Sequence, residues 1–329
     1  MSDPSDAHIL AAARLLRDGG LVAFPTETVY GLGANALDPL AVAGIFELKG
    51  RPRFDPLIVH LDTADLLPTV ADLTAIPTAI GGELIEQLVE RFWPGPLTLV
   101  LPKADAVPGI VTSDLPTVAV RVPDHPIARR LIRAAGVPVA APSANRFGRT
   151  SPTTAQHVAD SFADQSPLIL DGGPCRVGVE STVLSLIESR PRLLRPGGVA
   201  VEELEEITGP IERALPSSES ENSPASSPGM LASHYAPQTP LRLSDEAAPH
   251  PDSDRRCGLL AWRPTTTAGE FAALELLSSS GDLREAAANL FAAIRRLDQA
   301  GLDLIIATTP PPHGLGLAIQ DRLSRAAAR

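Results

Sequence analysis

Three cations within five positions give the first chemical signal in the sequence. Lys49, Arg51 and Arg53 are separated by one glycine and one proline, residues that break helices. An apolar run over residues 57–61 follows and predicts a strand. Cations on a stiff loop at the start of a strand suit a polyanion such as a nucleoside triphosphate. Taken alone, the stretch is equally compatible with a solvated basic turn.

The lysine at position 49 favours the phosphate interpretation. The chain contains 28 lysine and arginine residues, and only Lys49 and Lys103 are lysine. An ammonium group is a compact point charge, whereas a guanidinium group is a planar fork, so the two are not interchangeable at a phosphate. A lysine in such an arginine-rich set therefore indicates a contact that requires a point charge.

Most predicted strands in the first 209 residues end in small or polar side chains. Ligands of open α/β sheets bind where strand ends and the following loops converge. Hydroxyl groups can donate to and accept from a phosphate or an amino acid at little steric cost. The candidates at these ends, besides the basic stretch, are Thr26, Thr28, His60, Arg121, Ser143, Asn145, Ser151, Ser181 and Arg195.

Several familiar motifs are missing from the sequence. There is no Walker A sequence, no Gly-x-Ser-x-Gly, and no order of serine, histidine and aspartate that suggests a triad. Gly31-Leu32-Gly33 lacks a third glycine and Gly314-Leu315-Gly316 lacks an acidic partner, so both predict turns. His60 has no second histidine at metal spacing, and is either a core histidine or a ligand contact. Cys175 and Cys257 fit no metal or redox spacing and predict isolated thiols.

The elements that must position these residues alternate between helices and short apolar strands. This alternation predicts an α/β domain over residues 1–209, and the irregular spacing favours a mixed, twisted sheet over a doubly wound dinucleotide-type sheet. The predicted helices cover 7–17, 39–48, 82–92 and 124–135, with Asp6 as the N-cap of the first. The predicted strands cover 21–24, 57–61, 97–101, 117–122, 137–141, 168–170, 182–187 and 192–195, and residues 25–33 are predicted to be a loop.

The composition changes after residue 209. Residues 216–228 are rich in serine, proline and glutamate and cannot bury a core, so we predict a linker over residues 210–240. Its last part, 229–237, is less polar and is expected to be anchored. Residues 241–329 predict a smaller α/β domain with strands over 258–262 and 304–307 and helices over 283–300 and 318–328.

Charge and hydropathy exclude some classes of protein. A net charge of −11 argues against general binding to nucleic acid or to a membrane surface, while it allows a local basic pocket for a small anion. The sequence contains no run of 18 apolar residues and no apolar signal segment, so we expect a cytoplasmic protein.

A series of motifs resembles the YrdC-type domain of threonylcarbamoyl-AMP synthases. The motifs occur in the family's order at 25–33, 49–52, 56–60, 92–98, 118–121, 141–145, 151–153, 171–173, 180–183 and 195–197. The end of the linker, at 227–230 and 234–237, resembles the long form of the family, which carries an additional C-terminal domain. The resemblance therefore covers nearly the whole chain.

The resemblance implies a fold and an activity. The implied fold is a YrdC-like domain, with a twisted mixed sheet and a concave cleft, followed by a smaller Rossmann-like α/β domain. Similar proteins condense L-threonine, bicarbonate and ATP, with Mg²⁺, to threonylcarbamoyl-AMP and pyrophosphate. The implied partner is a downstream tRNA threonylcarbamoyl-transferase complex, which modifies an adenosine next to the anticodon. A weak direct contact with tRNA is compatible with the resemblance.

The resemblance also assigns roles to individual residues. The paired catalytic elements are Lys49 and Arg51 with Ser143 and Asn145. ATP contacts are implied for Arg51, Asp55, Thr117, Ser143, Ser151, Arg195 and Tyr235. Threonine contacts are implied for Thr28, His60, Arg121, Ala141 and Ser181, with Ala141 acting through its backbone. No protein side chain is assigned to a metal ion.

Two points qualify the chemistry that the resemblance implies. Asp55 stands where family members commonly carry asparagine, and a carboxylate near a triphosphate requires a metal ion or Arg53 beside it. The mixed anhydride product is labile in water, so we expect a cover over the site, and the linker with Tyr235 is the natural candidate.

Two alternatives belong to other classes of function. A module that binds double-stranded RNA without ATP turnover is disfavoured by the negative charge and the scarcity of aromatic residues. An enzyme that transfers a carbamoyl group to another acceptor usually carries cysteine-rich zinc-finger segments, whereas this chain has two cysteines.

Overall fold

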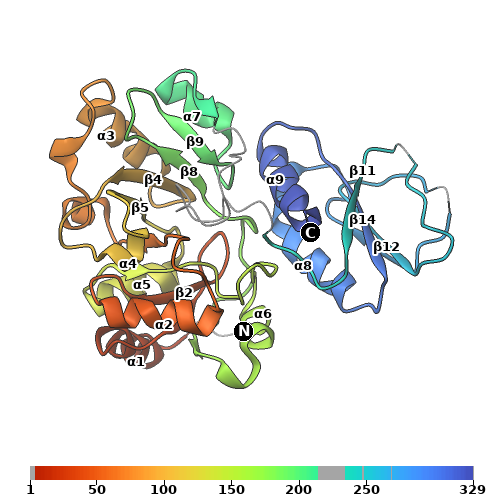
Figure 1. The fold of residues 1–329 in the computed structure, drawn as a ribbon, viewed down its shortest axis with the longest axis horizontal. Helices are drawn as coiled ribbons and strands as arrows, with labels where there is room; N and C mark the ends of the chain where they lie inside the picture. The colour runs from red at the N-terminus through yellow and green to blue at the C-terminus, as the bar shows by residue number, and fades with distance from the viewer. Residues whose placement is uncertain (1–3, 214–233, 247, 268, 329) are drawn as a thin grey trace.

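The strands of the described residues form two sheets. The computed structural model describes residues 4–213, 234–246, 248–267 and 269–328 (Figure 1). The larger sheet has ten strands in the order β10-β9-β8-β4-β5-β3-β6-β2-β1-β7. Its strands are β1 (Val22–Phe24), β2 (Gly31–Asn35), β3 (Ile58–His60), β4 (Leu97–Pro102), β5 (Thr117–Arg121), β6 (Val139–Ala140), β7 (Leu168–Ile169), β8 (Thr182–Ser185), β9 (Arg192–Arg195) and β10 (Glu212–Arg213).

The larger sheet is mixed, as the irregular spacing predicts. β3 runs parallel to β5, and β5 runs antiparallel to β4. The helices that accompany it are α1 (Asp6–Arg17), α2 (Pro39–Lys49), α3 (Gly81–Phe92), α4 (Gly109–Thr112), α5 (Pro126–Ala135), α6 (Ala155–Phe162) and α7 (Val201–Thr208), with 3₁₀ turns at Ala64–Thr69, Leu73–Ala75 and Ala163–Gln165.

Alternation along β1 shows how the sheet is covered on both faces. Val22 and Phe24 pack with the apolar residues of α1 and α5, whereas Ala23 packs into the main core with α2 and α3. Successive side chains of a strand point to opposite faces, so one three-residue strand contributes to both apolar clusters. The rest of the sheet's buried strands supply aliphatic side chains in the same way, which fits a chain with few aromatic residues.

Local signals set the ends of the helices that matter for the site. Asp38 caps α2 through its side chain, and Gly50 ends the helix in the left-handed conformation at φ 62°. Lys49 is therefore the last residue of α2 and the basic stretch begins at the turn. The predicted N-cap of α1 was wrong: Ser5 is the cap, and its hydroxyl accepts from the backbone N–H of His8. Asp6 is the first helical residue, where a carboxylate favours the positive end of the helix dipole.

Strand β2 is absent from the prediction because it contains two glycines. Glycine is depleted in strands, and we expected a loop over 25–33. In the structure, a Cβ atom on Gly33 would lie 2.7 Å from a ring atom of Phe24 and 2.8 Å from a methyl group of Val139. The glycine is required there because the neighbouring side chains leave no room for a larger residue.

The smaller sheet has four parallel strands in the order β11-β14-β12-β13. Its elements are β11 (Leu241–Ser244), β12 (Cys257–Ala261), β13 (Ala273–Leu276), α8 (Leu283–Asp298), β14 (Leu304–Thr308) and α9 (Leu315–Ala327). Figure 1 shows α8 and α9 between this sheet and the ten-stranded sheet. The expected second α/β unit is confirmed, although β11 and β13 were not predicted.

Part of the predicted linker, 214–233, lies outside the described residues, so the expectations for 216–228 and for most of 229–237 are not addressed. No helix among the residues that the structure describes is long and apolar enough to cross a membrane.

Candidate active site

One cavity of about 50 Å³ lies where the ends of the central strands meet the segment at 234–235. Ten of the residues predicted from the sequence line it: Thr26, Thr28, Arg51, His60, Arg121, Ala141, Ser143, Ser181, Arg195 and Tyr235. They come from the β1–β2 loop, the turn after α2, the ends of β3, β5 and β9, the loops after β6 and before β8, and the last part of the predicted linker. The structure thus brings the expected strand ends together at one cavity.

Four further predicted residues contact that lining. Lys49 donates from Nζ to the carbonyl oxygens of Ser143 and Asn145, at 2.6 and 2.5 Å. Asp55 forms an ion pair with Arg51, and the hydroxyl of Ser151 donates to Glu180 at 2.6 Å. Thr117 lies elsewhere: it begins β5, four residues before Arg121, and does not line the cavity. Its contact with ATP stays a prediction.

Lys49 is buried to an unusual degree for a lysine. Its side chain is 2% exposed, and burial, followed by the charge of Arg51, lowers its pKa well below the usual value, against the opposing effect of Asp55. An ammonium group has three donors, and two of them are directed to the Ser143 and Asn145 carbonyls. The group is thus fixed in place, and an anion entering the cavity would favour its charged form.

Asp55 is balanced by Arg51, whereas we expected Arg53 or a metal ion beside it. Arg51 donates from Nε to the Asp55 carbonyl at 3.0 Å, and its Nη2 lies 2.9 Å from the Asp55 carboxylate. The i, i+4 spacing in the turn after α2 brings the two groups together. Arg53 is exposed, and its carbonyl accepts from the hydroxyl of Ser113. The carboxylate at position 55 therefore orients a cationic residue of the cavity.

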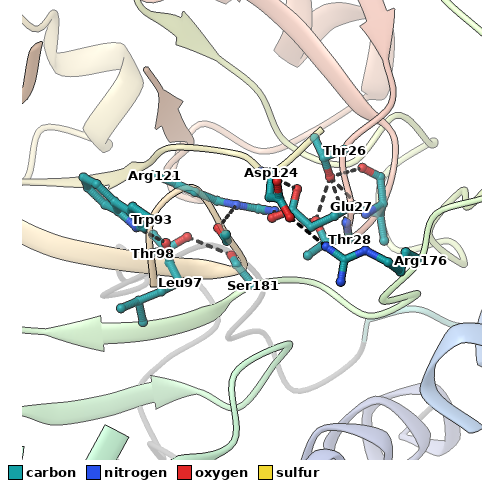
Figure 2. A network of polar contacts seen from close by, with 12 residues as sticks. Thr26, Glu27, Thr28, Trp93, Leu97, Thr98, Arg121, Asp124, Arg176 and Ser181 are labelled. Atoms are coloured by element: carbon teal, nitrogen blue, oxygen red, sulfur yellow. Dashed lines mark hydrogen bonds and ion pairs between the residues drawn. The ribbon is translucent and has the colours of Figure 1, made fainter. Parts of the chain in front are cut away.

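Arg121 is held from three sides at the end of β5 (Figure 2). Its Nη2 lies 2.6 Å from the Glu27 carboxylate, its Nη1 donates to the Thr28 hydroxyl at 3.0 Å, and its Nε donates to the Gly95 carbonyl at 3.1 Å. The other Glu27 oxygen accepts from the backbone N–H of Asp124. These contacts with described residues occupy three of the five guanidinium donors, which leaves two for a planar anion such as a carboxylate.

Ser181 is fixed by neighbours on three other strands or loops. Its hydroxyl lies 2.7 Å from that of Thr98, and Arg195 donates to its carbonyl oxygen at 2.9 Å. Gly197 packs against the same backbone: a Cβ atom there would lie 2.3 Å from the Glu180 carbonyl oxygen and from the Ser181 carbonyl carbon. The close approach of Gly197 therefore sets the position of two cavity residues.

Gly197→Ala is expected to destabilise the fold by about 1–3 kcal/mol, because the new methyl group meets backbone that cannot rotate away. Activity should fall further, since the displaced backbone carries Glu180 and Ser181. Thermal unfolding and turnover measure the two effects. Gly82→Ala is the control, because an added Cβ meets nothing within 4 Å there. Equal melting temperatures for the two variants would contradict the steric argument.

The two histidines of the cavity are neutral. Burial, and then the charge of Arg121, lowers the pKa of His60 to about 3, and its Nδ1 lies 3.2 Å from the Ile58 carbonyl oxygen. His60 is thus both a core residue and a cavity residue. Burial also lowers the pKa of His234 well below its usual value, with smaller effects from Arg51, Lys49, Arg195 and Arg322.

The stability of the protein is expected to fall in acid because of His234. Above about pH 6.5 a free histidine is neutral, so its burial carries no penalty from protonation. Below that pH the unfolded chain takes up a proton that the buried ring excludes, which lowers the free energy of unfolding by up to about 1.4 kcal/mol per pH unit until the depressed pKa is reached. Between pH 7.5 and 5.5, wild type should lose more stability than His234→Asn.

The control for this prediction is an exposed histidine. His250 pairs with Glu246 on the surface, and its side chain is 57% exposed. His250→Asn should follow the wild-type pH dependence. If His234→Asn also followed it in urea unfolding at both pH values, the acid sensitivity would not come from His234.

Tyr235 lies over the cavity in a strained conformation. Its φ is 63°, in the left-handed region that bulky residues rarely adopt. Backbone hydrogen bonds hold the segment on both sides of Tyr235. The N–H of Ala236 donates to the Gly148 carbonyl at 2.9 Å, and the N–H of His234 donates to the Arg325 carbonyl at 3.3 Å. The ring of Tyr235 also packs 5.6 Å from that of Phe291 in α8. The strain persists because these contacts fix the backbone.

Three charged residues of the site received no role from the sequence. Glu27 and Glu180 lie inside the recognised motifs, and only the structure shows their partners, Arg121 and Arg322. Their positions next to threonine and serine residues within these motifs were the signal from which a role for Glu27 and Glu180 could have been predicted. Arg322 lies in α9, and no local pattern marks it.

The fold and the cavity define an α/β enzyme with a cationic subsite beside a second subsite suited to a carboxylate. Comparisons with known proteins agree with this class. The model of the Sua5_yciO_yrdC family, described as "Telomere recombination", matches residues 14–197. The model of the Sua5_C family, described as "Threonylcarbamoyl-AMP synthase, C-terminal domain", matches residues 199–328. The chain belongs to the Sua5 family of threonylcarbamoyl-AMP synthases.

Curated relatives and a solved structure extend over almost the whole chain. The threonylcarbamoyl-AMP synthase of Pyrococcus abyssi is 44% identical over 331 residues, covering 97% of this chain and 93% of the relative. That of Bacillus subtilis is 46% identical over 337 residues, covering 98% and 94%. The crystal structure of P. abyssi Sua5 complexed with L-threonine superposes with a TM-score of 0.88 at 42% identity, covering 99% of this chain and 96% of that one.

Proposed function

We propose that this protein is an L-threonylcarbamoyladenylate synthase, which condenses L-threonine, bicarbonate and ATP. The observation that carries the proposal is the pair of subsites in one cavity: the cations Arg51 and Arg195, with Lys49 held against Ser143 of the lining, and the anchored guanidinium of Arg121. A relative that aligns with 99% of this chain is known in complex with L-threonine.

Threonine binding is assigned to the subsite around Arg121. The two unused donors of its guanidinium can hold the amino acid's carboxylate bidentately, and such charge-assisted contacts contribute roughly 1.5–3 kcal/mol each. Thr28 and Ser181 offer hydroxyl groups beside it, and His60 offers a neutral ring. The site is therefore rigid before the substrate enters, which limits the entropy lost on binding.

The chemical step requires charge cancellation and alignment. The threonine amine and bicarbonate form a carbamate with loss of water, and a carbamate oxygen then bonds to the α-phosphorus of ATP. The bond from that phosphorus to the oxygen bridging it to the β-phosphorus breaks, and pyrophosphate leaves with its electron pair. No protein nucleophile takes part, so the contribution of Lys49, Arg51 and Arg195 is to orient the phosphates and stabilise their charge.

Mg²⁺ is proposed to enter as part of the ATP substrate. Within the described residues no group of three or more histidine, cysteine or acidic side chains could hold a metal ion. The two acidic residues beside the cationic subsite, Asp55 and Glu180, are each paired with an arginine. The residues present therefore do not fit a protein-held metal centre, and phosphate oxygens are the natural ligands.

The segment over residues 210–240 is proposed to act as a cover between a domain at 1–209 and one at 241–329. Ligand pockets usually measure about 300–1,000 Å³, so a cavity of about 50 Å³ supports a movement of His234 and Tyr235 when the nucleotide enters. Once closed, the cover would keep water from the labile mixed anhydride.

The lability of the product also bears on partners and location. A consumer of threonylcarbamoyl-AMP must act close by, and we propose a tRNA threonylcarbamoyl-transferase complex in the cytoplasm. Direct contact of this chain with tRNA would be weak, since its net charge is −11.

The test is pyrophosphate release from ATP and Mg²⁺ with threonine and bicarbonate, each omitted in turn. Release that needs both co-substrates supports the synthase. ATP left intact in the complete mixture would overturn it, and salt-dependent binding of double-stranded RNA would then become the function to examine. Threonine-independent consumption of carbamoyl phosphate would instead indicate carbamoyl transfer to another acceptor.

A further inference from the structure

An arginine of the smaller unit contacts a residue that lines the cavity. Arg322 lies on α9 and its side chain is fully buried. Its Nε donates to the Glu180 carboxylate at 2.7 Å, and its Nη1 donates to the Pro196 carbonyl at 3.0 Å. Glu180 lines the cavity, so a single side chain separates α9 from the proposed substrates.

The opposite oxygen of Glu180 holds a residue of the ATP subsite. Ser151 donates from its hydroxyl to that oxygen at 2.6 Å, and the Ser151 side chain is fully buried. Arg322, Glu180 and Ser151 thus form one hydrogen-bonded series. A carboxylate facing a triphosphate would repel it, and the charge of Arg322 compensates that of Glu180.

Arg322 is itself fixed by two further groups. Asp321 lies 2.6 Å from its Nη1 and also pairs with Arg325 at 2.9 Å. The guanidinium carbon of Arg322 lies 5.1 Å from the centre of the Tyr235 ring, within the range of a cation–π contact. The same side chain therefore contacts both the loop at Glu180 and the aromatic residue that covers the cavity.

The packing around this series makes the contact specific. Val179 belongs to the apolar core of the smaller unit, and a Cβ atom on Gly178 would lie 2.4 Å from the Ala287 carbonyl oxygen in α8. Arg295 of α8 donates to the Thr150 carbonyl at 2.5 Å, next to Ser151. The two helices hold both ends of the hydrogen-bonded series from outside the cavity.

We propose that Arg322 is a positioning residue of the active site: it compensates the charge of Glu180 and holds that carboxylate against Ser151, and it supports Tyr235 over the nucleotide. The inference deepens the proposed function and rests on it for the identity of the nucleotide. It gives the smaller unit a part in ATP binding that a passive scaffold would not have.

The test is ATP binding by calorimetry between pH 5 and 8.5, without turnover. Arg322→Met should weaken ATP binding about tenfold or more at pH 7, because Glu180 is left buried without its counter-ion. Loss of a counter-ion favours the protonated form of a buried carboxylate, so ATP affinity should acquire an additional titration in this range, on top of the one that the ATP phosphates already give wild type. Arg322→Met combined with Glu180→Gln should lose that titration. Arg322→Lys should also lack it, since the ammonium restores the charge.

Arg296→Met is the control, because it removes an ion pair of the smaller unit, with Glu275, from an arginine whose side chain is 55% exposed. It should bind ATP like wild type at every pH. If Arg322→Met melts at a lower temperature but shows the wild-type dependence of ATP affinity on pH, Arg322 is only a structural contact and the inference is overturned. If Arg322→Met does not fold, Glu180→Gln decides, because it removes the carboxylate that links Arg322 to Ser151: ATP affinity equal to that of wild type at every pH overturns the inference.

The outcomes separate this inference from the function on which it rests. Wild type that binds ATP but releases no threonine-dependent pyrophosphate contradicts the synthase, while the pH profiles still decide the role of Arg322. Wild type that binds no ATP overturns both.

Discussion

Arg121→Ala should remove threonine-dependent turnover almost completely. The substitution deletes the proposed carboxylate contact and leaves the Glu27 carboxylate, 1% exposed, without its counter-ion. Loss of one partner of a buried pair costs about 3–5 kcal/mol. We therefore expect kcat/KM for threonine to fall about 10²–10³-fold and the melting temperature to fall with it.

A second variant separates the two effects of Arg121. Arg121→Ala combined with Glu27→Gln removes the unpaired charge and should recover most of the stability. It should not recover threonine binding, because the guanidinium is still missing. ATP affinity measured by calorimetry should change little in either variant. A threonine KM within twofold of wild type in the stable double variant would exclude Arg121 from the threonine subsite.

Lys49→Met is the second substitution for which we expect a large effect, and it should slow the chemical step. Methionine retains most of the unbranched side chain while removing the ammonium group, which donates to the Ser143 and Asn145 carbonyls. Fixed charges directed at a developing anion contribute about 2.7–4 kcal/mol in comparable sites, so kcat should fall about 10²–10³-fold. Pyrophosphate release at saturating threonine measures it.

The chain offers a matched control in its other lysine. Lys103 is half-buried and donates to the Val107 carbonyl at 3.0 Å, away from the residues that line the cavity. Lys103→Met should retain wild-type kcat. If kcat fell by a similar factor in Lys49→Met and Lys103→Met, the loss would not be specific to position 49. The interpretation of Lys49 as a phosphate contact would then be contradicted.

Local signals were sufficient for most of the larger fold. Apolar runs such as 97–101 and the glycine after Lys49 act within a few residues, so their elements could be predicted from the sequence. β2 could not, because Gly33 is required by close contacts with Phe24 in the preceding strand and with Val139, which is 106 positions further along the chain. The strand propensity of a residue carries no information about how closely a neighbouring strand approaches it.

The site divides in a similar way. Polar residues at strand ends, such as Arg121 and Ser181, could be predicted because sheet topology brings strand ends together. The ion pair between Glu180 and Arg322 joins residues that are 142 positions apart in the sequence. Glu180 lies just before β8 of the larger sheet, and Arg322 lies in α9 beside the smaller sheet. Nothing in the sequence near Arg322 distinguishes it from a surface arginine of an amphipathic helix, so only the folded arrangement identifies it.

The burial of Lys49 has a consequence for the reactivity of the protein toward amine-directed reagents. With two lysines in the chain, one of them 2% exposed, side-chain acylation of the closed form is confined to Lys103. A depressed pKa makes Lys49 a better nucleophile than an ordinary lysine once a reagent can reach it. The rate at which the acylated Lys49 peptide accumulates, followed by mass spectrometry, therefore reports how often Lys49 becomes accessible, without any labelled substrate.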